Sequence, residues 1–136
     1  MASVIEACPG CGVSTTIHVG QRGGDALTWS WALHCTNCGK TIEADDRGFP
    51  PPGYRRAIIE QEGLWEVVVS EGSTSSAVAL ALKDALEMDR ATALRVAKGI
   101  PGRVWQGTAA EAEWLRRRLE LRGIVATCER ARSDEG

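Results

Sequence analysis

The chain has 136 residues, enough for one ordinary domain or two small ones. Its 16 Lys and Arg residues nearly balance its 18 Asp and Glu residues, so it lacks the basic excess that strong binding to nucleic acid or membranes normally requires. Residues 1–9 contain neither the basic region nor the apolar core of a signal peptide, and no apolar run is long enough to span a membrane. We therefore expect a cytoplasmic protein without a membrane partner.

Two segments of the form Cys-x-x-Cys-Gly stand in the first third of the chain. The first contains Cys8 and Cys11, and the second contains Cys35 and Cys38. We expect each to form a tight turn that aims two thiolates at one point, with the following glycine allowing the backbone to turn where a side chain would clash. Four sulfurs in tetrahedral array suit Zn²⁺ and close its coordination sphere, so we predict one structural zinc ion.

Other uses of these cysteines are less consistent with the sequence. Two disulfides are disfavoured in a reducing cytoplasm, and a thioredoxin-type centre would need a Cys-x-x-Cys that opens a helix. A catalytic zinc would need an open position, which four thiolates do not leave. His18 and His34 lie close enough in sequence to compete as ligands, but His34 directly precedes Cys35 and would point away from the metal on an alternating strand. We interpret both histidines as surface or packing residues.

The residues around the cysteines predict a small sheet. Residues 15–19, 27–33 and 40–44 read as three antiparallel strands, the first two joined by a turn at residues 23–25. With the two cysteine turns, this pattern resembles the zinc-ribbon family over roughly residues 5–45. We assign residues 1–45 to a zinc ribbon. Residues 46–63 follow as a linker whose three consecutive prolines predict a stiff extended spacer without a helix.

The rest of the chain has a different character. Strands are predicted at residues 64–70, near residues 103–105 and at residues 124–128, and helices at residues 76–86, 89–98 and 109–122. Asp89 and Thr108 have the chemistry of helix N-caps, and Gly123 can provide a left-handed stop. The order β-α-α-β-α-β predicts a two-layer α/β domain over residues 64–130, with a polar tail at residues 131–136. The fold class of the whole chain is therefore α+β.

Three residues mark boundaries in this second part: Pro101 precedes the short strand, Gly107 ends it, and Gly123 ends the last helix. A proline and two glycines stand at the same places in the C-terminal domain of the bacterial ribosomal stalk protein, which the chain resembles over about residues 64–130. Residues 77–101 align with that family without a gap, and one residue is missing near Thr108. The same small fold is similar to that of the adaptor that hands N-end-rule substrates to the Clp protease, so a docking role stays open.

Departures from the stalk family bear on function. In that family the two-helix face that engages translational GTPases is basic and has a Gly-Leu-Gly turn. Here residues 87–89 are Glu-Met-Asp, Leu80 and Ala91 stand where lysines are expected, and only Lys83 keeps a basic character. A zinc ribbon also replaces the dimerising N-terminal segment of the family. We therefore expect that the chain does not stimulate translational GTPases.

The tryptophans are candidate binding residues. Trp29 and Trp31 are two residues apart and share one face of a strand, where they either pack a core or offer a surface for a base or a peptide. Trp105 stands where the stalk pattern has a solvent-facing charged residue, so its indole needs a cover. We expect that cover to be a partner protein, in which case Trp105→Ala leaves the thermal midpoint nearly unchanged. If Trp105 instead packs against the ribbon or the domain core, Trp105→Ala should lower the stability of the protein strongly.

Other side chains have simpler interpretations. Residues 116–118 are three arginines that fan across a helix, with glutamates at helical spacing, which favours a solvated face over a phosphate site. Cys128 is expected to be a small core residue. No motif for nucleophilic, phosphoryl-transfer or metalloprotease chemistry is found in the sequence, so we predict that the protein is not an enzyme and has no small-molecule substrate.

These observations lead to one functional prediction and one alternative. The chain is predicted to be a non-catalytic, cytoplasmic zinc protein that docks onto another protein, as an adaptor or as an immunity-type inhibitor. Candidate partner-binding residues are Trp105, Trp29, Trp31 and Lys83. The alternative is an accessory factor that binds nucleic acid or the ribosome through the tryptophan face and the arginine helix. Steep salt dependence of nucleic-acid affinity would favour the alternative.

Overall fold

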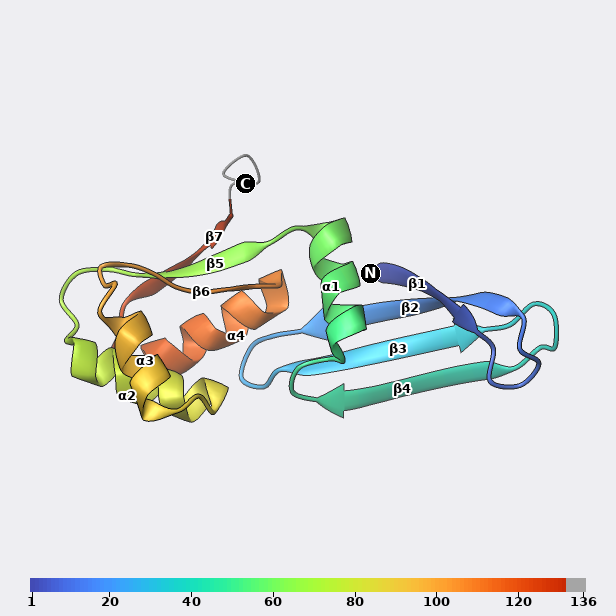
Figure 1. Cartoon of the computed structure of the whole chain (residues 1–136), viewed down its shortest axis with the longest axis horizontal. Coiled ribbons are helices and arrows are strands. Elements are labelled where there is room, and N and C mark those ends of the chain that lie inside the picture. Colours follow the sequence, from blue (N-terminus) through green and yellow to red (C-terminus); the bar gives the residue numbers. More distant parts are fainter. Residues whose placement is uncertain (132–136) are drawn as a thin grey trace.

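The computed structural model describes residues 1–131. Within them, seven strands form two antiparallel sheets, and four helices complete an α+β chain, so the predicted fold class is confirmed. The two sheets lie at opposite ends of an elongated molecule (Figure 1). None of the helices in this range is long and apolar enough to cross a membrane.

The N-terminal sheet has four strands in the order β1-β2-β3-β4. Their bounds are β1 Ala2–Ala7, β2 Ser14–Arg22, β3 Thr28–His34 and β4 Thr41–Arg47. The last three correspond to the predicted strands, whereas β1 was not predicted. Its apolar residues Val4 and Ile5 are adjacent, so they give no alternating pattern that would mark a strand with one buried face.

Alternation along these strands separates a packed face from a polar one. Ile17 pairs with Leu33 and Val19 pairs with Trp31 across β2 and β3, which places their side chains on one face. His18 lies on the opposite face, which is polar and exposed. The packed face belongs to a small hydrophobic cluster that also includes Ile58 from the following helix.

That helix, α1 (Pro52–Glu62), contradicts the prediction of an extended spacer through residue 63. Pro51 is the N-cap and Pro52 the first helical residue, a position where proline is favoured because its missing N–H would have no helical partner. Gly63 ends the helix, and its N–H donates to the carbonyl oxygen of Ile59. The helix lies across the inner end of the first sheet, between the two sheets (Figure 1).

The second part of the chain follows the predicted order β-α-α-β-α-β. Its elements are β5 Trp65–Val69, α2 Ser75–Leu86, α3 Arg90–Ala97, β6 Gly102–Gly107, α4 Ala109–Glu120 and β7 Ala126–Arg130.

The helix caps agree with those predicted from the sequence. Asp89 accepts a 2.7 Å hydrogen bond from the N–H of Thr92, and Thr108 forms a capping box with Glu111. β7 begins two residues later than expected and continues to Arg130. The sheet order is β6-β5-β7, with the core between this sheet and the helices.

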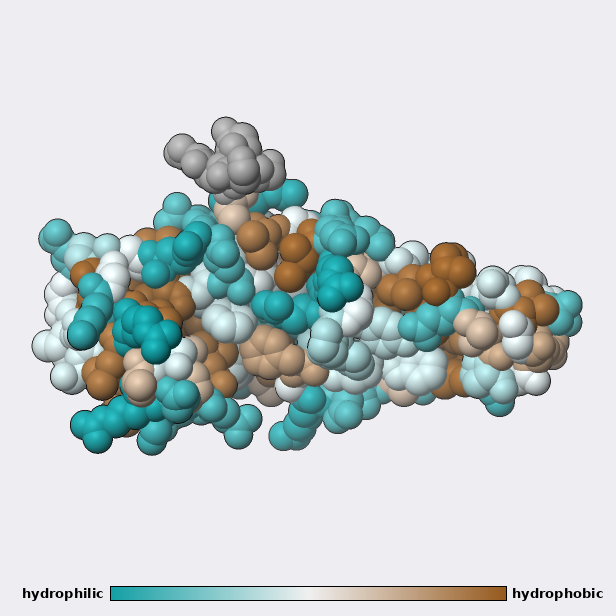
Figure 2. Space-filling view, viewed as in Figure 1, coloured by the Kyte–Doolittle hydropathy of each residue, from teal (hydrophilic) through white to brown (hydrophobic). Residues whose placement is uncertain are grey.

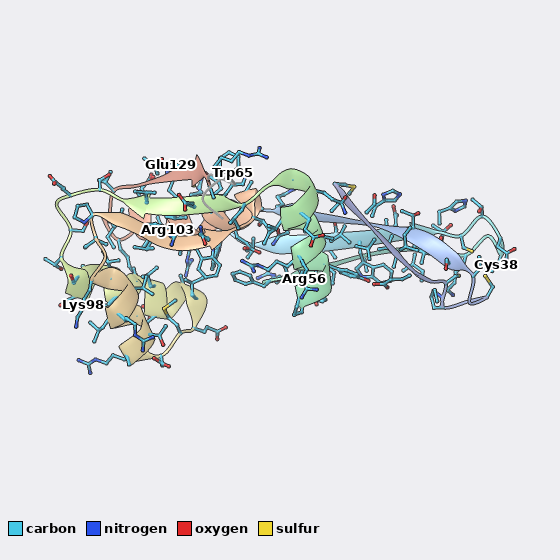
Figure 3. All side chains as sticks on the ribbon, turned by 45° about the horizontal axis from the view of Figure 1, so that its top comes forward. Cys38, Arg56, Trp65, Lys98, Arg103 and Glu129 are labelled. Atoms are coloured by element: carbon cyan, nitrogen blue, oxygen red, sulfur yellow. The ribbon has the colours of Figure 1, made fainter. Side chains whose placement is uncertain are left out.

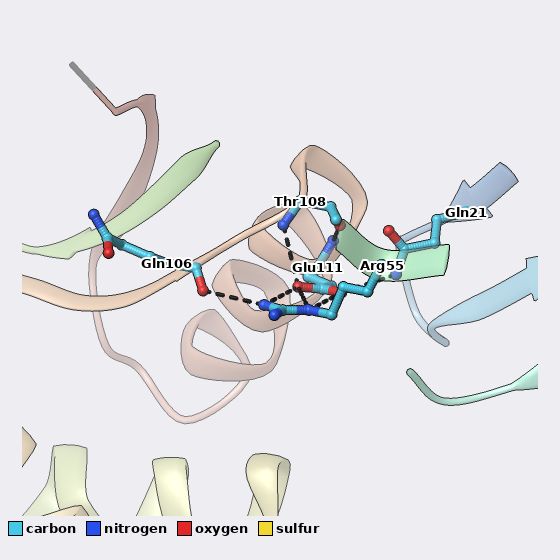
Figure 4. Close-up of polar contacts among 5 residues, drawn as sticks. All are labelled: Gln21, Arg55, Gln106, Thr108 and Glu111. Carbon is cyan, nitrogen blue, oxygen red and sulfur yellow. Dashed lines mark hydrogen bonds and ion pairs between the residues drawn. The ribbon is translucent and has the colours of Figure 1, made fainter. Parts of the chain in front are cut away.

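A buried ion pair joins the two parts of the molecule (Figure 4). Glu111 on α4 is fully buried, and the Nη2 and Nε atoms of Arg55 on α1 lie 2.9 Å and 3.1 Å from its Oε1. Gln21 at the end of β2 donates to the other carboxylate oxygen at 3.0 Å, and the backbone N–H of Thr108 donates to Oε1 at 3.1 Å. Gly23 lies so close to the backbone of Ala110 that a Cβ atom there would overlap its carbonyl oxygen. One carboxylate therefore holds β2, α1 and α4 together.

We predict that Glu111→Ala lowers the free energy of unfolding by about 3 kcal/mol, because it leaves Arg55 without its partner in a largely buried site. Glu111→Gln is the matched control, since an amide can keep the capping box but not the charge. Its loss should be smaller. The difference between the unchanged protein and Glu111→Gln measures the charge of the ion pair, and the difference between the two variants measures the capping box and the packing of the side chain. Urea unfolding followed by tryptophan fluorescence gives both values. Equal stability of Glu111→Ala and the unchanged protein would show that this pair does not hold the two parts together.

Candidate metal centre

The four predicted cysteines are brought together by two turns of the same form. In the first turn, the N–H of Gly12 donates to the carbonyl oxygen of Cys8 at 2.8 Å. In the second turn, the N–H of Gly39 donates to the carbonyl oxygen of Cys35 at the same distance. Both glycines have positive φ angles, 81° and 79°, a conformation that favours glycine over residues with a side chain. The sequence Cys-x-x-Cys-Gly therefore builds the same knuckle twice.

The sulfur positions fit a single metal ion. All four Sγ atoms lie within 4.8 Å of one another, and the closest pairs, Cys8 with Cys38 and Cys11 with Cys35, are 3.7 Å apart. A tetrahedral ion with Zn–S bonds of about 2.3 Å holds its sulfurs about 3.8 Å apart, whereas a disulfide requires about 2.0 Å. All four thiols are free. The donor set of four cysteines thus forms a metal-binding site, and its geometry is not that of two disulfides.

Hydrogen bonds to the sulfurs favour the thiolate at Cys8 and Cys11, whereas the neighbouring sulfurs oppose it at Cys38. The backbone N–H of Gly10 donates to the Sγ of Cys8, and the side-chain amide of Asn37 donates to the Sγ of Cys11, both at 3.3 Å. The Asn37 bond is the main reason that the pKa of Cys11 falls to about 6. For Cys38, the backbone N–H of Lys40 acts to lower the pKa, but burial and the three neighbouring cysteines together raise it to about 11. Four ionised thiols at this distance therefore need a cation among them.

The centre lies at the end of the first sheet that is farthest from the second sheet, where Cys38 is labelled in Figure 3. Cys8 and Cys35 are buried and join the hydrophobic cluster of the ribbon, whereas Cys11 and Cys38 are exposed. The two histidines do not belong to the cluster of ligands. His34 shares a 2.9 Å hydrogen bond with Thr41, and His18 lies 3.4 Å from the hydroxyl of Ser3. The site joins the turn between β1 and β2 to the turn between β3 and β4. This position is typical of a site that stabilises a fold.

The chain matches no known protein family, and no curated protein or solved structure is significantly similar to it. The resemblance of residues 64–130 to the ribosomal stalk domain therefore stays a prediction. So does the identity of the ion.

The candidate partner-binding tryptophans of the ribbon lie on one face, as their spacing predicted. The ring of Trp29 lies 6.1 Å from that of Tyr54 on α1, in an edge-to-face arrangement, and Trp31 packs against the hydrophobic cluster beside Tyr54. Both rings are partly buried. Lys83 is exposed on α2, where it lines a groove between α2 and α3. Partner binding by these residues stays a prediction; Lys83 is exposed, whereas Trp29 and Trp31 are partly buried.

Trp105 lies on β6, an edge strand, and residues of the chain itself provide a cover for its indole, which we expected from a partner. Partner binding by Trp105 stays a prediction. The ring of Phe49 approaches the indole edge to face at 5.9 Å, and the guanidinium of Arg55 lies 5.7 Å from its centre. Phe49 also contacts Trp114 at 6.0 Å, so one phenyl ring lies between two indoles. The cover comes from the segment predicted to be an extended linker. Because that segment folds back as Phe49 and α1, the indole ring is covered within the chain. Its buried Nε1–H has no hydrogen-bond partner within residues 1–131.

Sequence reasoning missed two groups that support these sites. Asn37 lies inside the second Cys-x-x-Cys, where a side-chain amide can donate to a sulfur. Its position between two metal-binding cysteines is the signal from which this contact could have been predicted. Arg55 gives no such signal, because its partner Glu111 is 56 residues away along the chain. Among the helix arginines, Arg116 bonds both Glu113 and Glu120, and Arg117 pairs with Asp25 of the ribbon.

We predict that the purified chain contains one zinc ion, which elemental analysis measures. Cys35→Ser should lose the ion, while Cys128→Ser, which changes the one cysteine outside the centre, should keep it. Chelation should unfold the ribbon, because small ribbons depend on their metal. Since Gln21 and Asp25 contact α4, the midpoint of the second part should also fall. A metal-free protein with oxidised cysteines would contradict this account.

We also predict that Trp105→Ala lowers the free energy of unfolding by about 3 kcal/mol, because it removes a packed indole from between Phe49 and the core. Leu121→Ala is the control, since Leu121 is 78% exposed and its truncation should change stability little. Thermal unfolding of both variants shows whether Trp105 stabilises the fold. An unchanged midpoint for Trp105→Ala would restore the view of Trp105 as a partner anchor with no structural role.

Proposed function

We propose that the chain is a zinc-stabilised, non-catalytic docking protein that binds another protein in the groove between α2 and α3. The observation that carries this proposal is the composition of that groove. It is lined by Ala79, Leu80 and Lys83 of α2 and by Arg90, Ala93 and Leu94 of α3. Small alanines at its floor let a partner side chain approach the helices closely, and two leucines offer apolar contact. Apolar surface lies among hydrophilic side chains over these helices at the left of Figure 2.

The exposure of Leu80 distinguishes this surface from the rest of the domain. Leu80 is 52% exposed although it stands next to Ala79 and Ala81, which are buried at 6% and 2%. A leucine held in water on a helix that already has a complete buried face contributes nothing to the domain's own core. Its burial under a partner would remove apolar area from solvent, which favours association. The groove thus has the apolar centre that protein interfaces require.

The charges of the groove indicate the chemistry of the partner. Lys83 and Arg90 lie on its walls, and within residues 1–131 neither forms an ion pair. The carboxylate of Asp89, in the turn between the helices, is occupied as the N-cap of α3. A helical segment with two or three apolar residues on one face and carboxylates beside them would complement this surface. We therefore expect an acidic amphipathic segment as the ligand.

Most of the side chains that suggested nucleic-acid binding are engaged within the chain, although no ion pair of Arg118 is found within residues 1–131. Arg116 bonds two glutamates, Arg117 pairs with Asp25, and Arg122 pairs with Asp84. The Trp29 and Trp31 side chains pack against α1 and the ribbon cluster. This arrangement supports a protein ligand over a nucleic acid. In this proposal the metal centre holds the ribbon together, and the ribbon supports α4 through Gln21 and Asp25.

The test places a photo-crosslinking side chain at Leu80 in the native host and identifies the products by mass spectrometry. We expect one protein, crosslinked through a segment that is both acidic and amphipathic. Lys83→Glu combined with Arg90→Glu should reduce its capture at least tenfold without changing the thermal midpoint, because both side chains are exposed. The control probe at Leu121, which is exposed outside the groove, should not give this product. Identical products from both probes, or crosslinks to nucleic acid that vanish at moderate salt, would contradict the proposal.

A further inference from the structure

The metal centre has a buried side and an exposed side. In each knuckle the first cysteine, Cys8 or Cys35, is buried, and the second, Cys11 or Cys38, is exposed. Figure 3 shows Cys38 at the outer end of the ribbon. A chelator or an electrophile that arrives from solvent therefore meets the sulfurs of Cys11 and Cys38 first. The contacts of these two sulfurs decide how firmly a bound ion is held.

The two exposed sulfurs have similar backbone contacts but different side-chain contacts. Cys11 receives a backbone N–H from Val13, and Cys38 receives one from Lys40. Cys11 also receives a side-chain donor, the amide of Asn37, whose nitrogen lies 3.3 Å from its Sγ. Within residues 1–131, no side-chain N–H is found on the sulfur of Cys38. The Asn37 bond is therefore the main difference between the two exposed ligands.

The shape of the turn does not explain why residue 37 is an asparagine. Asparagine is common in turns because it tolerates a positive φ, but Glu87 is the only non-glycine residue with a positive φ within residues 1–131. The Asn37 side chain is exposed and does not belong to the hydrophobic cluster of the ribbon. Its sulfur partner belongs to the other knuckle, 26 residues away along the chain. The amide–sulfur bond is thus the interaction that distinguishes this side chain.

A hydrogen bond to a metal-bound thiolate changes the chemistry of its sulfur. Four thiolates around a divalent ion carry excess negative charge, and an N–H that donates to one of them draws part of that charge away. The sulfur becomes a weaker nucleophile, and its direction toward the ion is fixed. Outer partners of this kind change metal affinity by about 10- to 100-fold. The Asn37 bond also joins the two knuckles to each other directly, without passing through the ion.

We propose that Asn37 is a positioning residue of the metal centre, whose amide holds the exposed sulfur of Cys11 in place and slows the loss of the ion. Cys38 has no such bond, so its sulfur is the first to be displaced by a chelator or alkylated by an electrophile. The carbon chain of Lys40 lies over Gly10 on the same side of the centre, but it leaves Cys38 exposed. The two exposed ligands therefore differ in reactivity.

The first test measures the release of zinc from the zinc-loaded full chain to an excess of the chelating dye 4-(2-pyridylazo)resorcinol. Asn37→Ala should release zinc about tenfold faster than the unchanged protein. Asn37→Asp keeps the size of the side chain but replaces its donor by a carboxylate beside a thiolate, so it should release zinc at least as fast as Asn37→Ala.

Thr36→Ala is the matched control for this test. Thr36 is the exposed neighbour of Asn37 in the same knuckle, and no hydrogen bond of its side chain is found within residues 1–131. Its rate of release should equal that of the unchanged protein. Thermal unfolding in the presence of zinc checks that each variant folds.

The second test identifies the sulfur that reacts first. Brief treatment of the zinc-loaded chain with iodoacetamide, followed by peptide mass spectrometry, should find Cys38 labelled before Cys11. In Asn37→Ala, the labelling of Cys11 should rise until it equals or exceeds that of Cys38. Cys128, which lies outside the centre, is the internal reference and should react equally in all variants.

Several results would overturn the proposal. If Asn37→Asp released zinc as slowly as the unchanged protein, the size of the side chain would matter and not its donor. If Cys11 were labelled before Cys38 in the unchanged protein, or if Asn37→Ala left the order of labelling the same, the amide would not protect the sulfur. A purified chain that binds no zinc would equally contradict it.

Discussion

Four sulfur atoms held within 4.8 Å of one another set the central constraint on this molecule. Thiolates at that distance repel one another unless a cation lies among them, and the two knuckles leave little freedom to separate. The sheet behind them has only a small cluster of buried side chains, in which Cys8 and Cys35 themselves take part. A core of this size rarely stabilises a sheet alone. We therefore expect the ribbon to depend on a metal ion bound by the four cysteines for its fold.

The second part of the molecule depends in turn on the ribbon. Gln21 and Asp25, at the end of the sheet opposite the cysteines, contact Glu111 and Arg117 on α4. Arg55 completes this junction and covers Trp105, so one guanidinium both neutralises a buried carboxylate and packs on an indole. The metal centre and the α2–α3 groove are thus connected through a fixed junction. The segment that joins the two sheets is therefore not a stiff extended spacer, because α1 forms part of the junction.

Local signals in the sequence predicted the second part well. Asp89, Thr108 and Gly123 act at the ends of the helices they mark, because capping depends on a few neighbouring residues. The two cysteine turns could be predicted for the same reason, because each is formed by five consecutive residues. The elements that were missed or wrongly predicted depend on distant partners. α1 is stabilised by the burial of Ile58 against a sheet, and Trp105 is covered by Phe49, neither of which local pattern reveals.

The coordination of the metal is the quantity on which this account depends most. X-ray absorption at the zinc edge of the purified, unchelated chain measures it directly. We expect four sulfur neighbours at about 2.3 Å and no oxygen or nitrogen neighbour, as for a closed four-thiolate site. A first shell that contains oxygen or nitrogen, or a chain without zinc whose sulfurs are joined at about 2.0 Å, would contradict it.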